Sequence, residues 1–236
     1  MGYNGTDNLK IMECAKNYNE FLVNLVLKRL KIKKRNFKKI LDFGCADGFF
    51  MEKIFKKDPS LNLSGVDSDN EAILSCKLKG FNCFLELKEI DEKEKFDFIY
   101  SFNALEHILD DVQVLSDLNK KLNEKGELLL YLPAFNFLFS SMDRKIGHYR
   151  RYDKKDIIKK LKTAGFKNVK AEYCDFIGVF ATLAYILKDK FFKNNNGNIK
   201  EAQIKFYDCI FPLSLFFDNF LKLFLGKNII VIASKS

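Results

Sequence analysis

The sequence predicts an α/β fold with one doubly wound, mostly parallel sheet of seven strands. Short apolar runs alternate along the chain with segments of helical periodicity. The run "KKILDF" passes into the Gly-rich bend "GCADG" and then into the helical pattern "FFMEKIFKK", which is typical of the first half of a βαβ unit. A length of 236 residues with 47% hydrophobic and 30% charged residues suits one well-buried domain.

The elements follow in order. Apolar residues at helical spacing before position 39 predict one or two helices that form an N-terminal helical cap. Strands are expected at "KKILDF" (38–43), 62–67, 82–87, 96–101, 126–133, 168–174 and 228–234. Intervening helices are expected at 70–78, 112–122 and 154–164, and the polar run "KNNNGN" at 193–198 predicts an exposed loop. Strands that alternate with helices favour parallel pairing.

An apolar helical insertion precedes the last strand, at 177–227. Two apolar patterns, "FIGVFATLAYILKDKFF" and "YDCIFPLSLFFDNFLKLFL", stand where a tight hairpin would suffice, and so much apolar surface must be buried against something. It either extends the core or forms a dimer interface, or it forms a lid over an apolar substrate or a membrane-touching surface at 177–226. The longest nearly apolar run, 176–187, is shorter than the roughly 20 residues that span a bilayer.

Charge and cysteine usage limit the partners. A net charge of +9 suits an anionic partner such as nucleic acid, a phosphorylated small molecule or a membrane surface, although much of the excess lies at 28–39, a run typical of a solvated helix end. The six cysteines show no CxxC pairing, so neither a metal site nor a disulfide framework is expected. Reduced thiols and an N-terminus without the features of a signal peptide indicate a cytoplasmic protein, for which peripheral association with the membrane is the further possibility.

The Gly-rich bend predicts a ligand site. Gly44 and Gly48 permit positive φ angles and flank the small residues Cys45 and Ala46, and the helix start near Gly48 offers unpaired N–H groups. Asp67 closes the next strand about twenty residues later, which suits a carboxylate that accepts the two hydroxyls of a ribose.

The glycine spacing separates two cofactor classes. A dinucleotide dehydrogenase favours G-x-G-x-x-G, whereas here the spacing is G-x-x-x-G and Asp42 stands inside the strand before the bend. A carboxylate at that position can hold the ammonium group of an amino-acid ligand.

Together these residues resemble the class I S-adenosylmethionine-dependent methyltransferases, whose first motif is similar to residues 40–48. "KFDFIYSFNALEHILDD" (95–111) resembles the fourth strand and following loop of that superfamily, and "LNEKGELLLYLPA" its fifth strand. "DRKIGHYRRYDKKDIIKKLKTAGF" (143–166) further resembles a bacterial and archaeal small-molecule subgroup with a D…GH.RRY motif, in which an N-terminal pattern like Tyr18-Asn19 also occurs. The likeness covers nearly the whole chain.

The resemblance implies a Rossmann-like methyltransferase fold in a single domain over 1–236. Its parts are expected to be N-terminal helices at 1–39, a cofactor-binding core at 40–135, an acceptor-side loop with the sixth strand at 136–176, the apolar insertion at 177–227 and the last strand at 228–236.

The resemblance also implies the cofactor, S-adenosyl-L-methionine, with S-adenosyl-L-homocysteine as product. The cofactor-binding residues expected from it are Asp42, Gly44, Cys45, Ala46, Gly48, Asp67, Ser68, Asn103 and Ala104. The acid that often contacts adenine in this superfamily is not obvious, and Glu86 and Asp91 are the two candidates.

The acceptor side is expected around "GHYRRY" (147–152), beyond the carboxyl end of the fifth strand. His148 is the first candidate for the catalytic base because imidazole is largely neutral at cytoplasmic pH, and His107 is the rival. The candidates for substrate binding are Arg150 and Arg151 as a clamp for a phosphate or carboxylate, with Tyr149, Tyr152 and Tyr18. The alternative is structural: one arginine pairs with Asp143 or Asp153 and the tyrosines pack the loop down.

The function expected is O-methylation of an anionic small molecule such as a sugar, a sugar phosphate or a lipid-linked cell-surface intermediate. RNA or protein methylation is the second possibility, and nucleic acid is the less favoured partner because the chain has neither an Asn/Asp-Pro-Pro-aromatic motif nor an appended RNA-binding module. The third is a non-catalytic binding or scaffold protein that keeps the fold.

Overall fold

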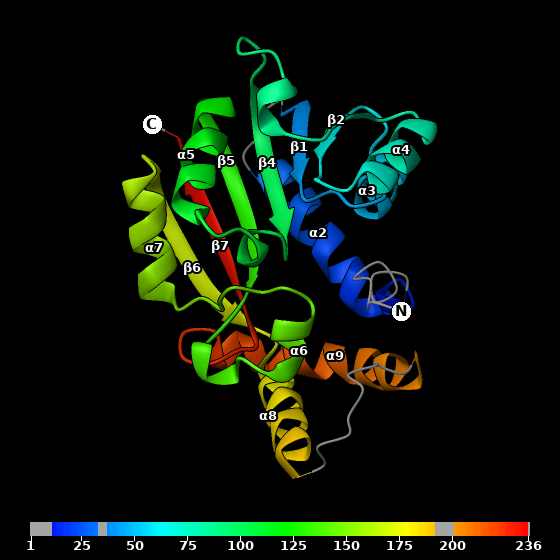
Figure 1. Cartoon of the computed structure of the whole chain (residues 1–236), viewed down its shortest axis with the longest axis vertical. Coiled ribbons are helices and arrows are strands. Elements are labelled where there is room, and N and C mark those ends of the chain that lie inside the picture. Colours follow the sequence, from blue (N-terminus) through cyan, green and yellow to red (C-terminus); the bar gives the residue numbers. More distant parts are fainter. Residues whose placement is uncertain (1–10, 33–36, 192–200, 236) are drawn as a thin grey trace.

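The seven expected strands form one sheet in the computed structural model, which describes residues 11–32, 37–191 and 201–235. The strand order is β3-β2-β1-β4-β5-β7-β6, and every pairing is parallel except those of β7, which runs antiparallel to β5 and β6 (Figure 1). The strands are β1 (Lys39–Phe43), β2 (Asn62–Val66), β3 (Asn82–Phe84), β4 (Phe96–Phe102), β5 (Leu122–Pro133), β6 (Lys167–Cys174) and β7 (Asn228–Ser234). The doubly wound α/β prediction is confirmed.

Helices connect the strands where the periodicity predicts them. They are α2 (Lys16–Ile32), α3 (Phe49–Lys57), α4 (Asn70–Leu78), α5 (Asp111–Lys121), α6 (Ser141–Lys145), α7 (Lys154–Thr163), α8 (Phe176–Phe191) and α9 (Glu201–Leu221), with short 3-10 turns η1 (Leu87–Glu89), η2 (Leu105–His107) and η3 (Asn136–Leu138). Two strand boundaries differ from the prediction by more than one residue. β3 ends at Phe84 rather than at 87, where η1 begins, and β5 begins at Leu122 rather than at Gly126, because Leu122 pairs with Phe96 across an irregularity in the ladder.

The sheet is covered on both faces, which explains its apolar strands. Alternate residues of a strand enter opposite layers, so that Ile40 packs with α2, α3 and α9 whereas Leu41 packs with α5 and α7. Helix α2 forms the expected N-terminal cap, and the backbone N–H groups of Asn17 and Tyr18 donate to the carboxylate of Asp208 in α9. Residues 1–10, part of the basic run at 33–36 and the predicted loop at 193–198 lie outside the described residues.

Much of the apolar insertion is exposed, which is contrary to the alternative that it extends the core. In the 16-residue helix α8 only Gly178 and Val179 are buried. The buried face of α9 includes the polar residues Asp208, Ser214 and Asp218, while its phenylalanines largely face outward. Figure 1 shows both helices projecting from the end of the molecule toward which β4 points. Across the described ranges, no helix is long and apolar enough to cross a membrane.

Candidate functional site

The candidate site lies at the point in the sheet where the order of the strands reverses, between β1 and β4. Strands β1 and β4 are neighbours, but the chain continues from β1 to β2 on one side and from β4 to β5 on the other. Ligands of open α/β sheets bind outside the carboxyl ends of the strands at this switch point.

The loops after β1 and β4 touch at Gly44. Its φ is +85°, and a Cβ atom there would lie 2.4 Å from the Cβ of Ala104. Gly48, with φ of +81°, begins α3, and its missing Cβ leaves room for the sulfur of Cys76. Both expected glycines therefore hold the bend in a shape that a side chain at either position would disturb.

Asp67 closes β2 beside this bend. One carboxylate oxygen accepts the Ala46 N–H at 2.8 Å and the other accepts the Asp69 N–H at 3.0 Å. The side chain is half-buried and Ser68 is exposed, so the remaining lone pairs face solvent at the position expected for ribose hydroxyls. The bend and its acid are thus joined before any ligand arrives.

Asp42 supplies a buried carboxyl group beneath the same bend. Burial raises its pKa well above the ordinary value, and the nearby Asp67 raises it further, whereas the neighbouring Tyr100 hydroxyl lowers it. Asn103 is exposed with φ of +50°, and its N–H donates to the carbonyl of Tyr131. A carboxyl group that is costly to ionise when buried alone is a suitable partner for a cationic ligand group.

The two candidates for the adenine contact are both exposed on the β3 side. Glu86 forms an ion pair of 2.6 Å with Lys88, and Asp91 accepts the backbone N–H of Lys93. No contact given for either side chain directs it toward the bend, so the structure does not decide which of the two acids is the adenine contact.

The segment 147–152 is fixed to the carboxyl ends of β4 and β5. Tyr152 pairs with Ala134 beyond β5, and the N–H of Tyr149 donates to the carbonyl of Glu106 after β4. The Tyr152 ring is fully buried, and its hydroxyl donates to Asp111 at 2.9 Å. Tyr152 is therefore a packing residue and not the acceptor contact expected, whereas Tyr149 is exposed and available for one.

Arg151 does not form the expected clamp, because its guanidinium is buried against Asp143. Its Nε and one terminal nitrogen donate to the two carboxylate oxygens at 2.8 and 3.0 Å. Arg150 is likewise engaged, at 2.7 Å from Asp111. The structural alternative holds for both arginines, since buried or half-buried guanidinium groups require a carboxylate partner.

The pair formed by Arg151 and Asp143 orients His148. Nδ1 of His148 lies 2.9 Å from Asp143, whose pKa is held low against the effect of its burial by His148, Arg151 and Ser140. Because an ionised carboxylate only accepts hydrogen bonds, Nδ1 carries the hydrogen and Nε2 is left as the basic nitrogen. This relation of acid to imidazole is the one that prepares a general base.

Glu106 faces that nitrogen from η2. Its carboxyl oxygen lies 3.7 Å from Nε2 of His148, and the side chain is fully buried. Neither of its oxygens has a hydrogen-bond partner among the residues that the structure describes. Burial raises its pKa to about 8. The carboxyl group is therefore uncharged near neutral pH.

His107, the rival base, lies beside His148 with ring centroids 4.6 Å apart. Burial and the neighbouring His148 lower its pKa to about 4, so it is neutral at physiological pH. The ligand atoms of Glu106, His107 and His148 lie within 4.8 Å of one another, close enough to hold a divalent cation as well as to move a proton.

Tyr18, a candidate for substrate binding, belongs to the core. Its ring is buried and packs edge-on against Tyr131 and Phe211 at centroid distances of 6.0 and 5.3 Å. Only its hydroxyl approaches the site, where it lies 3.5 Å from the side-chain amide of Asn103. The helical spacing of Tyr18 marks a core position, not an acceptor contact.

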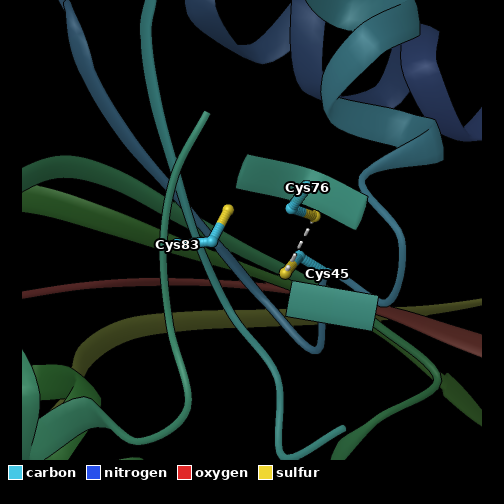
Figure 2. A group of neighbouring side chains, drawn as sticks. All are labelled: Cys45, Cys76 and Cys83. Atoms are coloured by element: carbon cyan, nitrogen blue, oxygen red, sulfur yellow. Dashed lines mark hydrogen bonds between the residues drawn. The ribbon is translucent and has the colours of Figure 1, made fainter. Parts of the chain in front are cut away.

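Three of the cysteines, which show no pairing motif in the sequence, lie together in the fold. Cys45, Cys76 and Cys83 are far apart in the sequence, yet their sulfur atoms lie within 4.8 Å of one another below the Gly-rich bend (Figure 2). They come from the bend, α4 and β3, so the βαβ topology and not a short sequence motif brings them together.

Sequence reasoning anticipated an arginine partner for Asp143, but it missed the burial of Glu106 and the contact of Asp143 with His148. The signal was present in both cases, because each is an acid within an apolar or motif-bearing stretch close to a histidine: "LEH" at 105–107 and "DRKIGH" at 143–148. Aspartate and glutamate are seldom fully buried unless a partner group compensates for the burial.

Fold and site together define an α/β protein whose switch point carries a Gly-rich bend, two carboxyl groups and a histidine oriented by an aspartate. A family model described as a methyltransferase domain matches residues 14–171, and the chain belongs to this family.

Solved structures and curated relatives agree with that fold. A phosphoethanolamine N-methyltransferase 2 of Haemonchus contortus in complex with S-adenosyl-L-methionine has a TM-score of 0.60 and 17% identity, over 90% of this chain and 52% of that one. A SAM-dependent methyltransferase of Archaeoglobus fulgidus has a TM-score of 0.57 and 20% identity, over 91% and 93% of the two chains. A tRNA U34 carboxymethyltransferase of Helicobacter hepaticus is 27% identical over 39% of this chain and 34% of its own length, so the match spans about a third of that relative.

Proposed function

We propose that the chain is an S-adenosylmethionine-dependent O-methyltransferase whose acceptor is a lipid-linked molecule presented at an anionic membrane surface. The observation that carries the proposal is the histidine His148, held by Asp143 beside the switch point of a methyltransferase-family fold. Assignment to the subgroup with the D…GH.RRY motif remains part of this proposal.

The residues of the bend fit the cofactor. The half-buried carboxylate of Asp67 suits its ribose hydroxyls, and the bare backbone at Gly44 permits close approach of its amino-acid portion. The buried carboxyl group of Asp42 lacks a cation in the described part of the chain, and the ammonium group of the cofactor would provide one.

When bound, S-adenosylmethionine supplies a sulfonium methyl group that is attacked in line. Nε2 of His148 would accept the proton that the acceptor hydroxyl loses as the methyl group is transferred, with S-adenosylhomocysteine as the leaving group. Asp143 stabilises the resulting imidazolium ion through Nδ1. The carboxyl group of Glu106, 3.7 Å from the same nitrogen, would lie beside the imidazolium ion once His148 holds the proton.

Arg150 and Arg151 do not support an anionic acceptor, because both are paired with aspartates. Support for a lipid-linked acceptor comes instead from α8 and α9. Phe216, Phe220 and Phe224 are 57%, 69% and 73% exposed, which is far more than a free soluble surface usually leaves for clustered phenylalanines.

Positive charge accompanies this apolar surface. Lys188 and Lys190 lie in the last turn of α8, Lys205 lies in α9, and Lys222 directly follows α9. Phenylalanines that enter the acyl boundary and lysines that meet anionic headgroups are the pattern of a helix lying in a membrane interface. A second copy of the chain is the competing occupant, and the oligomeric state tests it.

The cofactor is tested by calorimetric titration with S-adenosylmethionine and S-adenosylhomocysteine. We expect micromolar binding that Asp67→Ala weakens at least tenfold without loss of fold. Folded, ligand-free protein that binds neither compound would instead support the scaffold alternative.

The membrane surface is tested by flotation with vesicles containing phosphatidylglycerol. We expect Phe216→Ser/Phe220→Ser to lose flotation, whereas Leu78→Ser, which removes an 82% exposed leucine from α4, retains it. Equal flotation of both variants, or a dimer that the double variant dissociates, would contradict membrane docking.

RNA methylation is the second candidate, favoured by the net charge of +9 and by the likeness to the tRNA-modifying relatives. Salt-sensitive retention of the protein on tRNA, with transfer of labelled methyl groups to it, would favour this function over a lipid-linked acceptor.

A further inference from the structure

Three thiols converge beneath the cofactor bend, in a space that two glycines keep open. A Cβ on Gly65 in β2 would lie 2.6 Å from the sulfur of Cys45 and 3.0 Å from that of Cys83. A Cβ on Gly48 would lie 2.9 Å from the sulfur of Cys76. The backbone thus leaves room for sulfur where any other residue would fill it.

The separations of the sulfur atoms match those of metal ligands. The Cys45 and Cys76 sulfurs are 4.0 Å apart, and all three lie within 4.8 Å of one another (Figure 2). Three thiolates bound at about 2.3 Å in a tetrahedral arrangement lie roughly 3.8 Å apart, so a small contraction converts the triad into a ligand set.

A fourth ligand atom is adjacent. The carbonyl oxygen of Ala46 lies 3.3 Å from the Cys76 sulfur and 3.6 Å from the Cys45 sulfur. It accepts weak hydrogen bonds from both thiols, and it would face two negative sulfurs once they were deprotonated. A cation bound between the carbonyl oxygen and the two sulfurs would replace this repulsion by three favourable metal–ligand contacts.

We propose that Cys45, Cys76 and Cys83 form a site for one thiophilic divalent ion of the zinc class, completed by the carbonyl oxygen of Ala46. Binding releases three thiol protons and forms three metal–sulfur bonds, which leaves a site of charge −1. The ion would join the cofactor bend to α4 and β3. Without it, packing and a few hydrogen bonds link the bend to α4, such as those from the Lys79 ammonium group to Asp47. The site is independent of the acceptor chemistry and of the proposed substrate.

The test uses Cd²⁺ as a spectroscopic probe on the full, reduced chain without cofactor. Titration should produce a sulfur-to-cadmium charge-transfer band in the ultraviolet that saturates at about one equivalent, as the single site requires. Zn²⁺ should then suppress the band by displacing cadmium, and either ion should raise the Tm.

Matched variants separate the triad from the other thiols. Cys76→Ser and Cys83→Ser should each lose the band, and two variants are used so that one which fails to fold, as judged by circular dichroism, does not decide the result. Cys174→Ser, which removes a buried cysteine in β6, and Cys209→Ser, which removes an exposed one, should retain it. Absence of a saturable band in the wild type, or its survival in a folded triad variant, would overturn the proposal.

Discussion

Replacing Glu106 by glutamine should change how the stability of the protein depends on pH. Glu106 is a fully buried carboxyl group without a hydrogen-bond partner, and burial raises its pKa from 4.5 to about 8. Glutamine has nearly the same shape and does not ionise. The substitution therefore removes the titration and leaves the packing in place.

The magnitude follows from proton linkage. Below the ordinary pKa of 4.5 the group is protonated in both the folded and the unfolded chain, and it has no differential effect. Between 4.5 and about 8 the unfolded carboxyl ionises while the folded one stays protonated, so the free energy of unfolding falls by about 1.4 kcal/mol per pH unit as pH rises. From about pH 5.5 to about pH 7.5 the wild type should lose roughly 3 kcal/mol that the variant keeps.

Urea denaturation of wild type and Glu106→Gln across this range measures the difference directly, because all other titrating groups are shared. Glu92→Gln, at an exposed position in the turn before β4, is the matched control and should parallel the wild type. If the wild-type and Glu106→Gln curves run parallel, Glu106 ionises normally in the folded chain and the argument from burial is wrong.

Three further substitutions test the site and its supports. Gly44→Ala should abolish cofactor binding because its Cβ would meet the Cβ of Ala104 at 2.4 Å. The control is Gly80→Ala, at a similar φ of +87° with nothing within 4 Å of the added Cβ, which should keep cofactor affinity and cost only about 1 kcal/mol of backbone strain in thermal unfolding. Equal effects of the two variants would refute the steric argument. Asp143→Asn should cost about 3–5 kcal/mol in urea denaturation because it leaves the buried Arg151 unpaired, and a loss well below this would mean that the guanidinium reaches solvent. Asp218→Ala should cost about 1–3 kcal/mol, since its carboxylate accepts two backbone N–H groups at the start of α8; an unchanged midpoint would show that water replaces it.

Local sequence patterns were sufficient for the fold. The bend after β1 and the regular alternation of helix and strand depend on neighbouring residues, so the strand pattern and the positions of Gly44 and Asp67 were predictable. The strand boundary at Leu122 was not predictable, because it depends on a pairing with β4 that no local pattern encodes.

The candidate site was less predictable because its key contacts join distant residues. The role of Arg151 depends on whether Asp143 reaches it first, and both the clamp and the pair were compatible with the sequence. The thiol triad needs three separate elements to meet, so no short sequence motif indicates it. In α9 the apolar phenylalanines turned outward because Asp208 and Asp218 are needed inward as hydrogen-bond acceptors for other helices.

The position of β7 within the sheet carries a consequence for biosynthesis. This strand is made after β5 and β6 but lies between them, antiparallel to both. As the chain emerges from the ribosome, β5 therefore exposes an unpaired edge and β6 has no neighbour, while α8 and α9 already present their phenylalanines. Such edges and apolar surfaces recruit chaperones or other nascent chains. Premature termination before Asn228 would leave an aggregation-prone fragment and not a smaller working domain.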